Sequence, residues 1–186
     1  MMKKWLFSSL LILLYTSCSA AKTLTLDDVK FDEATGTITD YLGHATEITI
    51  PYNLKGVPVV KIGFTAFAAK GITKVTIPES VTIIGSKSFA ENALTSLVIP
   101  DSVTILGEGA FLENKLTEVS LSDSVSEIGF GVFYGNRLTS VTIPDSVNKI
   151  GEWAFRNNAL TEVTVPASVT SLNDSAFDDN VLITRK

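Results

Sequence analysis

Few residues of this 186-residue chain could carry out chemistry, and most of those occupy repeated positions. The chain has one cysteine, Cys18, and one histidine, His44. Carboxylates and hydroxyls are frequent, but they recur at regular intervals with no neighbouring base to activate a nucleophile. A lone histidine is more often a surface or capping residue than a catalyst. Because the sequence also lacks a Gly-rich phosphate loop, we expect no enzyme activity, no cofactor and no small-molecule substrate.

One set of acidic residues invites comparison with a calcium site. It recurs every 22 residues, immediately after a proline or serine, and comprises Glu79, Asp101, Asp123 and Asp145. On adjacent strands these carboxylates would lie about 5 Å apart. Each position supplies one carboxylate, whereas calcium takes several oxygen ligands. We therefore expect turn residues that face water, and no metal.

The first 20 residues have the pattern of a secretory signal. Lys3 and Lys4 precede a mostly apolar stretch from Trp5 to Tyr15, and small residues follow it. This stretch is too short for a membrane-spanning helix. The sequence therefore predicts export, with residues 1–20 set apart from the fold.

Cys18 lies where the apolar stretch meets the small residues. Tyr15-Thr16-Ser17-Cys18 resembles the lipobox of bacterial lipoproteins, although position −3 is usually leucine and is Tyr15 here. Acylation with more than one chain would hold the protein stably at a membrane. The alternative is ordinary cleavage after Ala21, which would give a secreted protein. We favour lipidation of Cys18, because the sole cysteine falls where this processing needs it.

The charge of the chain excludes one class of partner. Cleavage before Cys18 removes two lysines and no acid, which takes the formal net charge from −5 to −7. An acidic domain has no electrostatic footprint for nucleic acid and is repelled by anionic lipid. Membrane contact is therefore expected through the lipid anchor only. With no second cysteine, the core must be held together by packing.

A 22-residue phrase dominates the rest of the sequence: Leu-Thr-x-Val-x-Ile-Pro-x-Ser-Val-x-x-Ile-Gly-x-x-Ala-Phe-x-x-Asn. Such a period marks a solenoid, in which each repeat contacts mainly its neighbours. The alternating Val and Ile predict one short strand per repeat, and the valine and isoleucine after the proline fill a return leg. Residues that lie 22 positions apart occupy the same place in successive repeats, and we call such a set a column. An unbroken column of phenylalanines is expected in the core: Phe67, Phe89, Phe111, Phe133, Phe155 and Phe177.

Two further columns have small or amide side chains. Gly63, Gly85, Gly107, Gly129 and Gly151 are followed in the last repeat by Asn173. Glycine and asparagine both tolerate positive φ, which predicts a left-handed turn in every repeat. The asparagines should satisfy buried backbone groups and each other; they are Asn92, Asn114, Asn136, Asn158 and Asn180.

The two ends need separate treatment because a solenoid end exposes apolar surface. Residues 21–45 are expected to form a short linker and a cap, a β-hairpin that turns at Ala34-Thr35-Gly36. Residues 46–186 form the repeat domain, with six repeats and a terminal strand from Leu182. Charged side chains near that edge should discourage end-to-end stacking.

The phrases ITKVTIPESVTIIGSKSFAEN and LTSVTIPDSVNKIGEWAFRNN resemble the BspA-like leucine-rich repeats of bacterial surface proteins. The first repeat carries a five-residue insertion before Lys61 and resembles the opening repeat of that family. Single departures are Ser122 for proline, Asn173 for glycine and Lys70 for asparagine. The resemblance implies a right-handed leucine-rich-repeat solenoid with a parallel sheet on one face. It also implies a secreted or surface protein linked to adhesion and protein binding, with no shared catalytic motif.

A few aromatic residues depart from the repeat. Phe130 and Tyr134 lie in the fourth repeat and Trp153 in the fifth, and Tyr134 shares a column with Arg156. Tyr, Trp and Arg dominate binding hot spots, which makes these four residues our candidate protein-binding site. The alternative is that the aromatics pad the convex side of the core.

These observations together predict a cell-envelope lipoprotein with a leucine-rich-repeat protein-binding domain. Its place would be the outer membrane or the cell surface, and its partner a protein or matrix macromolecule in surface adhesion. The alternative is a structural or envelope-assembly repeat protein with no foreign ligand.

Overall fold

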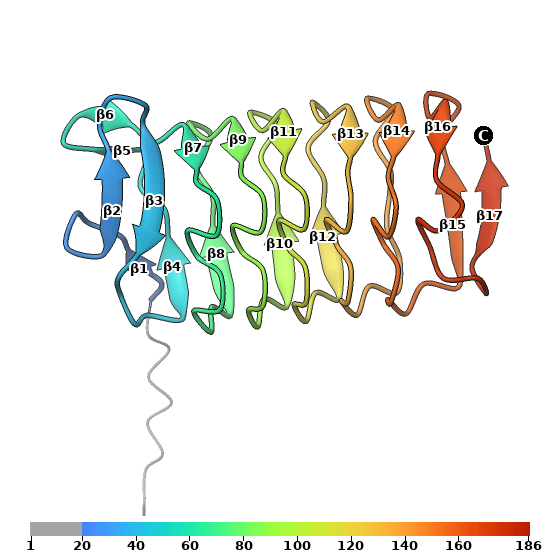
Figure 1. Ribbon diagram of the computed structural model, residues 1–186, viewed down its shortest axis with the longest axis horizontal. Helices are drawn as coiled ribbons and strands as arrows, with labels where there is room; N and C mark the ends of the chain where they lie inside the picture. Colours follow the sequence, from blue (N-terminus) through green and yellow to red (C-terminus); the bar gives the residue numbers. More distant parts are fainter. Residues whose placement is uncertain (1–19) are drawn as a thin grey trace, which may run out of the picture.

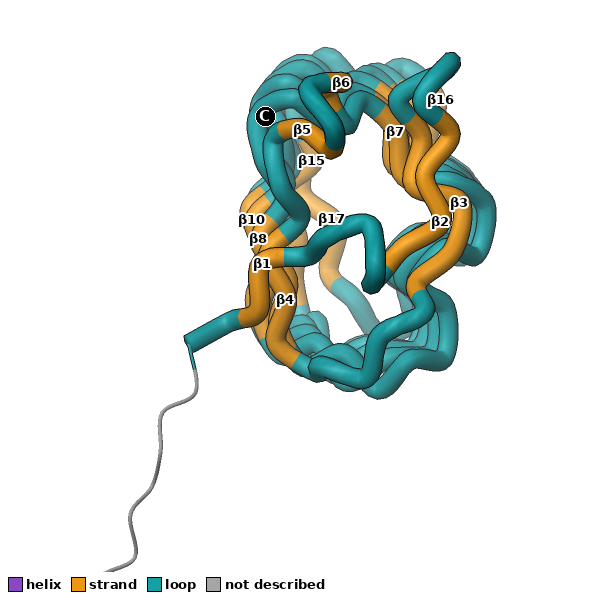
Figure 2. The backbone as a smooth tube through the Cα atoms, turned by 90° about the vertical axis from the view of Figure 1, so that its left-hand side faces the viewer, coloured by secondary structure: helices purple, strands orange, loops and turns teal. Residues whose placement is uncertain are grey.

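The computed structural model describes residues 20–186, so Cys18 and nearly all of the predicted signal segment lie outside the described part. Each repeat makes one turn of a coil, and the turns stack along a single axis (Figure 1). Viewed along the axis, each turn is a flattened ring with strands on two opposite sides (Figure 2). Repeats 1 to 6 begin at residues 46, 72, 94, 116, 138 and 160. Residues 20–186 contain no helix, and none that could span a membrane.

The first side of the ring, called row A here, contains the predicted strands. Neighbouring strands pair in parallel, with Leu97 opposite Val119, and side chains alternate between core and solvent. The ladder is interrupted between β8 and β10, and again between β12 and β15, where repeat 5 has no strand in this row. The strands are β1 Lys22–Thr23, β4 Glu47–Thr49, β8 Lys74–Thr76, β10 Ser96–Val98, β12 Glu118–Ser120, β15 Glu162–Val165 and β17 Leu182–Arg185.

The opposite side, row B, holds a second strand in every repeat, whereas the sequence predicted one strand per repeat. These strands have only two residues each, too few for an alternating pattern to reveal them. Row B is split between β11 and β13. The strands are β7 Lys61–Ile62, β9 Ile83–Ile84, β11 Ile105–Leu106, β13 Glu127–Ile128, β14 Lys149–Ile150 and β16 Ser171–Leu172.

The expected phenylalanine column forms a continuous stack in the core. Successive ring centroids lie 5.0 to 5.7 Å apart, and the planes differ by no more than 14°. Tyr41 extends the stack at its N-terminal end, 5.4 Å from Phe67. The Tyr41 hydroxyl donates to the carbonyl of Ala45 at 2.9 Å. A full stack of buried rings supplies much of the apolar burial that each repeat needs.

The asparagine column binds the backbone of two repeats at once. Asn114 Nδ2 donates to the carbonyls of Phe89 (2.9 Å) and Phe111 (3.2 Å), and Oδ1 accepts from the Leu94 amide (3.1 Å). The same pattern recurs at Asn92, Asn136 and Asn158. The predicted satisfaction of buried backbone is confirmed for these four residues, whereas Asn180 is exposed. Within residues 20–186 the four side chains bond to backbone and not to one another.

The prediction for the glycine column is wrong. Gly63, Gly85, Gly107, Gly129 and Gly151 do not have positive φ. At every one of them except Gly129, the backbone of the preceding turn leaves no room for a side chain: a Cβ on Gly107 would be 2.2 Å from the Ser86 nitrogen. Positive φ occurs instead in two other columns, namely Thr65, Lys87, Gly109, Gly131 and Trp153, and then Ala69, Glu91, Glu113, Gly135 and Asn157.

The N-terminal cap is a hairpin, as the sequence predicted. β2 (Val29–Asp32) and β3 (Thr37–Tyr41) are antiparallel, and β3 continues row B through parallel pairing with β7. The insertion in repeat 1 forms a second, smaller hairpin of β5 (Asn53–Leu54) and β6 (Val57–Pro58). Both ladders are therefore covered at this end, since β1 also pairs with β4 in row A.

A buried carboxylate holds the chain as it enters the cap. Asp28 accepts hydrogen bonds from Lys22 Nζ (2.5 Å), the Thr25 amide (2.9 Å) and the Thr25 hydroxyl (3.0 Å). Its side chain is 6% exposed. The pKa of the Asp28 carboxyl is lowered, chiefly by the hydrogen bond from Lys22 and further by those from Thr25, whereas burial acts in the opposite direction. The segment from β1 to β2 thus depends on an ionised Asp28.

Gly107→Ala should lower the free energy of unfolding by about 2–3 kcal/mol, because the new methyl group meets the backbone of repeat 2. Gly129→Ala is the matched control from the same column, since its Cβ would meet only Glu127 Oε1 at 3.8 Å. We expect that variant to change stability by less than about 0.5 kcal/mol. Urea unfolding measures both, and equal losses would contradict the close-approach explanation.

Asp28→Asn should lower stability at pH 7 by about 2 kcal/mol, since charge-assisted bonds to a buried group are lost. The folded pKa of Asp28 lies below its unfolded value of about 3.9, so its contribution is present above that pH and disappears as the pH falls through the folded pKa. The difference between wild type and variant should therefore shrink below about pH 4. Urea unfolding at several pH values tests this, with exposed Asp27→Asn as the control.

Candidate functional site

The structure brings the three off-pattern aromatics together. Trp153 lies between the other two rings, 5.3 Å from Phe130 and 5.9 Å from Tyr134, with interplanar angles of 42° and 39°. Phe130 is 43% exposed and Trp153 40% exposed, while Tyr134 is half-buried. We call these three residues the aromatic cluster. Its rings pack against one another at the surface and do not join the phenylalanine stack.

The cluster is positioned by two stacked turns that follow row B. In repeat 4 the Tyr134 amide donates to the Gly131 carbonyl at 3.1 Å, and in repeat 5 the Arg156 amide donates to the Trp153 carbonyl at 3.2 Å. The Gly131 amide bonds the Glu152 carbonyl at 3.0 Å and holds one turn against the next.

Trp153 occupies a position that disfavours a large side chain. Its φ is 57°, and the two preceding repeats have glycine there, Gly109 and Gly131. Positive φ is a genuine outlier for a bulky residue and costs on the order of 1–3 kcal/mol. The contacts with Phe130 and Tyr134 offset part of that cost, yet the indole stays 40% exposed. Folding stability alone is therefore a poor explanation for tryptophan at this position.

Arg156, the fourth candidate, lies in the next turn of the Tyr134 column. The Gly135 amide donates to the Arg156 carbonyl at 3.1 Å, which places the two turns side by side. Arg156 Nη1 forms an ion pair with Asp179 at 3.3 Å, and the side chain is half-buried. The guanidinium is thus engaged with the last repeat.

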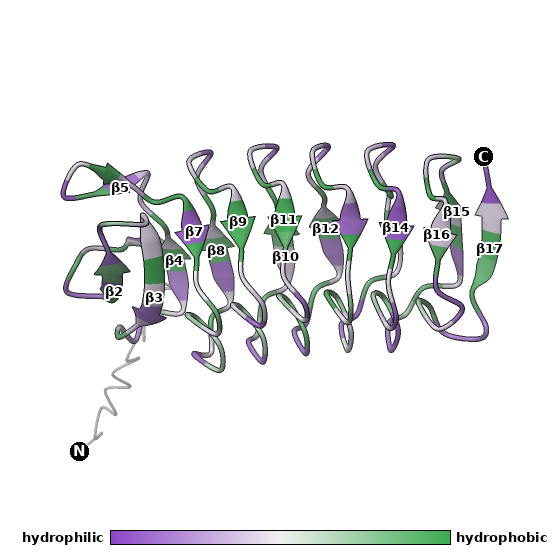
Figure 3. Ribbon diagram, turned by 45° about the horizontal axis from the view of Figure 1, so that its top comes forward, coloured by the Kyte–Doolittle hydropathy of each residue, from purple (hydrophilic) through white to green (hydrophobic). Residues whose placement is uncertain are grey.

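A shallow groove of about 370 Å³ adjoins Phe130 where row B is split between β11 and β13. Its apolar wall includes Ile105, which is 53% exposed. Glu108 and Glu127 also line it, and Glu127 is paired with Lys149 at 2.8 Å. In Figure 3, β9 and β11 are hydrophobic whereas β13 and β14 carry hydrophilic residues. Sequence analysis missed Ile105, although its column has Lys61, Glu127 and Lys149 in other repeats.

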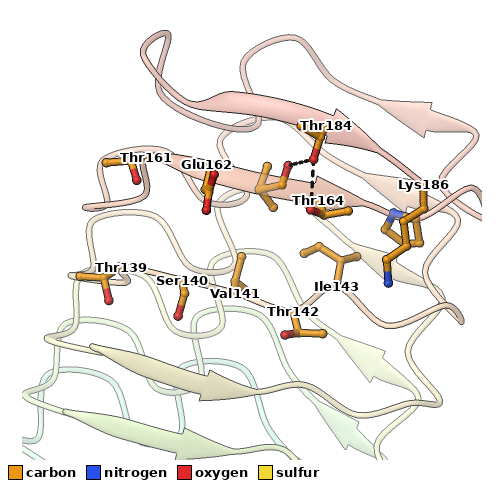
Figure 4. Close-up of a pocket in the computed structure, with 12 residues that line it drawn as sticks. Thr139, Ser140, Val141, Thr142, Ile143, Thr161, Glu162, Thr164, Thr184 and Lys186 are labelled. Carbon is orange, nitrogen blue, oxygen red and sulfur yellow. Dashed lines mark hydrogen bonds between the residues drawn. The ribbon is translucent and has the colours of Figure 1, made fainter.

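A second groove, of about 400 Å³, opens on row A where repeat 5 lacks a strand (Figure 4). Hydroxyl groups dominate its lining, and Thr164 and Thr184 share a hydrogen bond of 3.1 Å. Glu162 and Lys186 are its charged residues. It offers hydrogen bonds to a partner but no aromatic anchor.

The remaining candidates for chemistry are dispersed over the molecule. His44 is exposed in the loop between β3 and β4, and the acidic column faces solvent. Asp101 Oδ1 accepts the amide of Asp123 at 3.0 Å, as a turn residue does. Among residues 20–186 no three His, Cys, Asp or Glu side chains gather as metal ligands would.

A coil of short parallel strands, with a phenylalanine stack and an asparagine ladder inside, is a leucine-rich-repeat solenoid. The chain belongs to the BspA-type leucine-rich-repeat family, whose sequence model matches residues 60–184 in six copies. Proteins of this family are bacterial surface or cell-envelope proteins. Their repeats form protein-interaction domains and are typically non-enzymatic scaffolds.

Solved structures similar to this chain include two bacterial leucine-rich-repeat proteins. The T. pallidum leucine-rich-repeat protein is 23% identical with a TM-score of 0.47, over 83% of this chain and 66% of that one. A leucine-rich-repeat protein from Bacteroides ovatus is 22% identical with a TM-score of 0.43, over 80% of this chain and 55% of that one. The chain thus spans about two thirds of the first protein's length and about half of the second's. No match was found among curated proteins.

Proposed function

We propose that this chain is a non-catalytic binding module of the cell envelope, and that the aromatic cluster with Arg156 at its border is its contact site for a protein or matrix partner. The observation that carries this is the aromatic cluster itself, in which the indole of Trp153 packs against Phe130 and Tyr134 at the surface and stays 40% exposed. Tyr, Trp and Arg are also the residues that contribute most at interfaces.

The proposal includes a role in surface adhesion, which the family's location supports. It also includes a lipid anchor on Cys18, which lies four residues before β1 in the sequence. Such an anchor would hold the cap end of the solenoid at the membrane. The cluster, three repeats beyond the first, would then stand roughly 15 Å farther out at the spacing of adjacent strands.

A second candidate function, assembly between copies, rests on the last strand. All four residues of β17 are exposed, including Leu182 (61%) and Ile183 (42%), and β17 pairs only with β15 among residues 20–186. An unpaired edge of this kind is a template for pairing with another chain.

Replacing Phe130, Tyr134 and Trp153 together by alanine should reduce partner recovery at least about tenfold, since hot-spot residues are lost. Recovery is measured by affinity capture from host-matrix and envelope extracts with a chain that begins at residue 19. The matched control is Tyr52→Ala with Phe64→Ala, which removes two exposed rings (60% and 68%) from repeat 1. Equal recovery by both variants would refute the site, and capture of the chain itself would favour assembly between copies.

Cys18→Ala should abolish fatty-acid incorporation and release the protein from the membrane fraction, because no other cysteine is available. Metabolic labelling with a fatty acid, followed by fractionation of the cells, measures both. Ser17→Ala is the control, since it keeps a small residue before the cysteine. Unchanged labelling of the Cys18 variant would refute the anchor without affecting the binding site.

A further inference from the structure

Carboxylates surround the aromatic cluster. Glu108, Phe130 and Glu152 occupy one column in repeats 3, 4 and 5. Their turns are held in contact by backbone bonds from the Gly109 amide to the Phe130 carbonyl (2.9 Å) and from the Gly131 amide to the Glu152 carbonyl (3.0 Å). Phe130 therefore has a carboxylate-bearing residue on either side of it along the solenoid axis.

A third carboxylate lies beside Tyr134. A Cβ on Gly135 would be 3.2 Å from Glu113 Oε1, so this carboxylate covers the residue next to Tyr134. Within residues 20–186 Glu108, Glu113 and Glu152 form no ion pairs.

The cations near the cluster do not neutralise these groups. Lys149 is paired with Glu127 and Arg156 with Asp179. Lys87 lies against Gly109, while Lys115 and Arg137 follow Glu113 and Gly135 by two residues, and within residues 20–186 these three cations form no ion pair. No cation is thus paired with the carboxylates that flank Phe130, and the chain as a whole has a net charge of −5.

The groove beside Phe130 places an apolar recess next to the unpaired carboxylate of Glu108. Its volume of about 370 Å³ is near the lower limit of ligand pockets, which suits an inserted side chain. Ile105 and Phe130 line it, and Glu108 lies at the same groove. An aliphatic side chain can thus be buried within reach of a carboxylate.

Trp153 completes the surface, because an exposed indole is the best aromatic partner for a cation. An Arg or Lys over the ring would also meet the carboxylate-bearing residues of the adjacent turns. The cation and the aliphatic residue would lie on neighbouring parts of one segment, since Phe130 contacts both the groove and Trp153.

We propose that the aromatic cluster and the adjoining groove bind a basic segment of a partner protein. One aliphatic side chain of the segment enters the groove between Ile105 and Phe130, and a neighbouring Lys or Arg packs on Trp153 among Glu108, Glu113 and Glu152. This inference rests on the proposed function of the cluster and specifies its partner by charge and by anchor.

The chain itself contains the probe for this binding. Its two tryptophans are Trp5 and Trp153, so a chain that begins at residue 19 has Trp153 as its only indole. Three synthetic peptides are titrated while tryptophan emission is recorded: one alternating Leu with Lys and Arg, one with every cation replaced by Glu, and one with every Leu replaced by Ser. We expect saturable emission changes with the first peptide, at least about tenfold weaker binding of the other two, and weaker binding at high salt.

Glu108→Gln with Glu152→Gln should weaken binding of the Leu/Lys/Arg peptide about fivefold to tenfold and reduce its salt dependence. The control is Glu118→Gln with Glu162→Gln, which makes the same change in charge on exposed residues of row A, on the opposite side of the ring (Figure 2). Urea unfolding verifies that both variants are folded. Equal weakening by both pairs would overturn the proposal, because it would show a general charge effect.

The outcomes also separate this inference from the proposed function. If the triple alanine variant loses its captured partner while all three peptides bind alike or not at all, the cluster is a contact site but not for a basic segment. Emission changes with neutral oligosaccharides, without a preference for the basic peptide, would overturn the proposal in favour of a glycan. Loss of basic-peptide binding in the Ile105→Ser variant supports insertion into the groove.

Discussion

The fold depends on a single repeated interaction, the hydrogen bonding of one asparagine amide to the phenylalanine turns of two successive repeats. The carbonyl of each phenylalanine accepts from two successive asparagines: Phe89 from Asn92 and Asn114, and Phe111 from Asn114 and Asn136. Buried backbone groups without partners are costly, so each turn must bring its successor to a fixed position. That fixed rise then places the rings in stacking contact and the glycines against the preceding backbone. Every column of the sequence is a consequence of this shared spacing.

The residues of the regular columns could be predicted from the sequence, because the 22-residue period shows which residue types recur at the same place in each repeat. The phenylalanine stack and the strands of row A are of this kind. The physical reason for a column is harder to read, as the glycines show. Asn173 in the last repeat suggested positive φ, but its Oδ1 accepts the Ser175 amide at 2.9 Å and the residue is exposed at the loose end of the coil. The sequence does not give the distance between successive repeats. That distance shows that the backbone of the preceding turn, and not positive φ, requires glycine at these positions.

The candidate site could be predicted in part. The aromatic residues are visible as exceptions, and Gly109 and Gly131 in the column of Trp153 were an overlooked sign that its backbone is unusual. The groove beside Phe130 could not be predicted, because it arises where the ladder opens between β11 and β13. The groove on row A likewise follows the missing strand of repeat 5. No residue type marks either interruption.

Interruptions are tolerated because the interior supplies the stability. Ser122 replaces a proline, yet its buried hydroxyl donates to the Val103 carbonyl at 2.7 Å and accepts the Ser124 amide at 3.0 Å, so the turn is retained. In the same way, two interactions hold the turn that bears Trp153: Phe155 packs in the phenylalanine stack, and the Trp153 amide donates a hydrogen bond to the Ser175 carbonyl. A scaffold that enforces each turn from within can carry strained or exposed side chains outside it. Repeats 3 to 5 carry such side chains on one surface. There the break between β11 and β13 lies beside the aromatic cluster and the unpaired carboxylates of Glu108, Glu113 and Glu152.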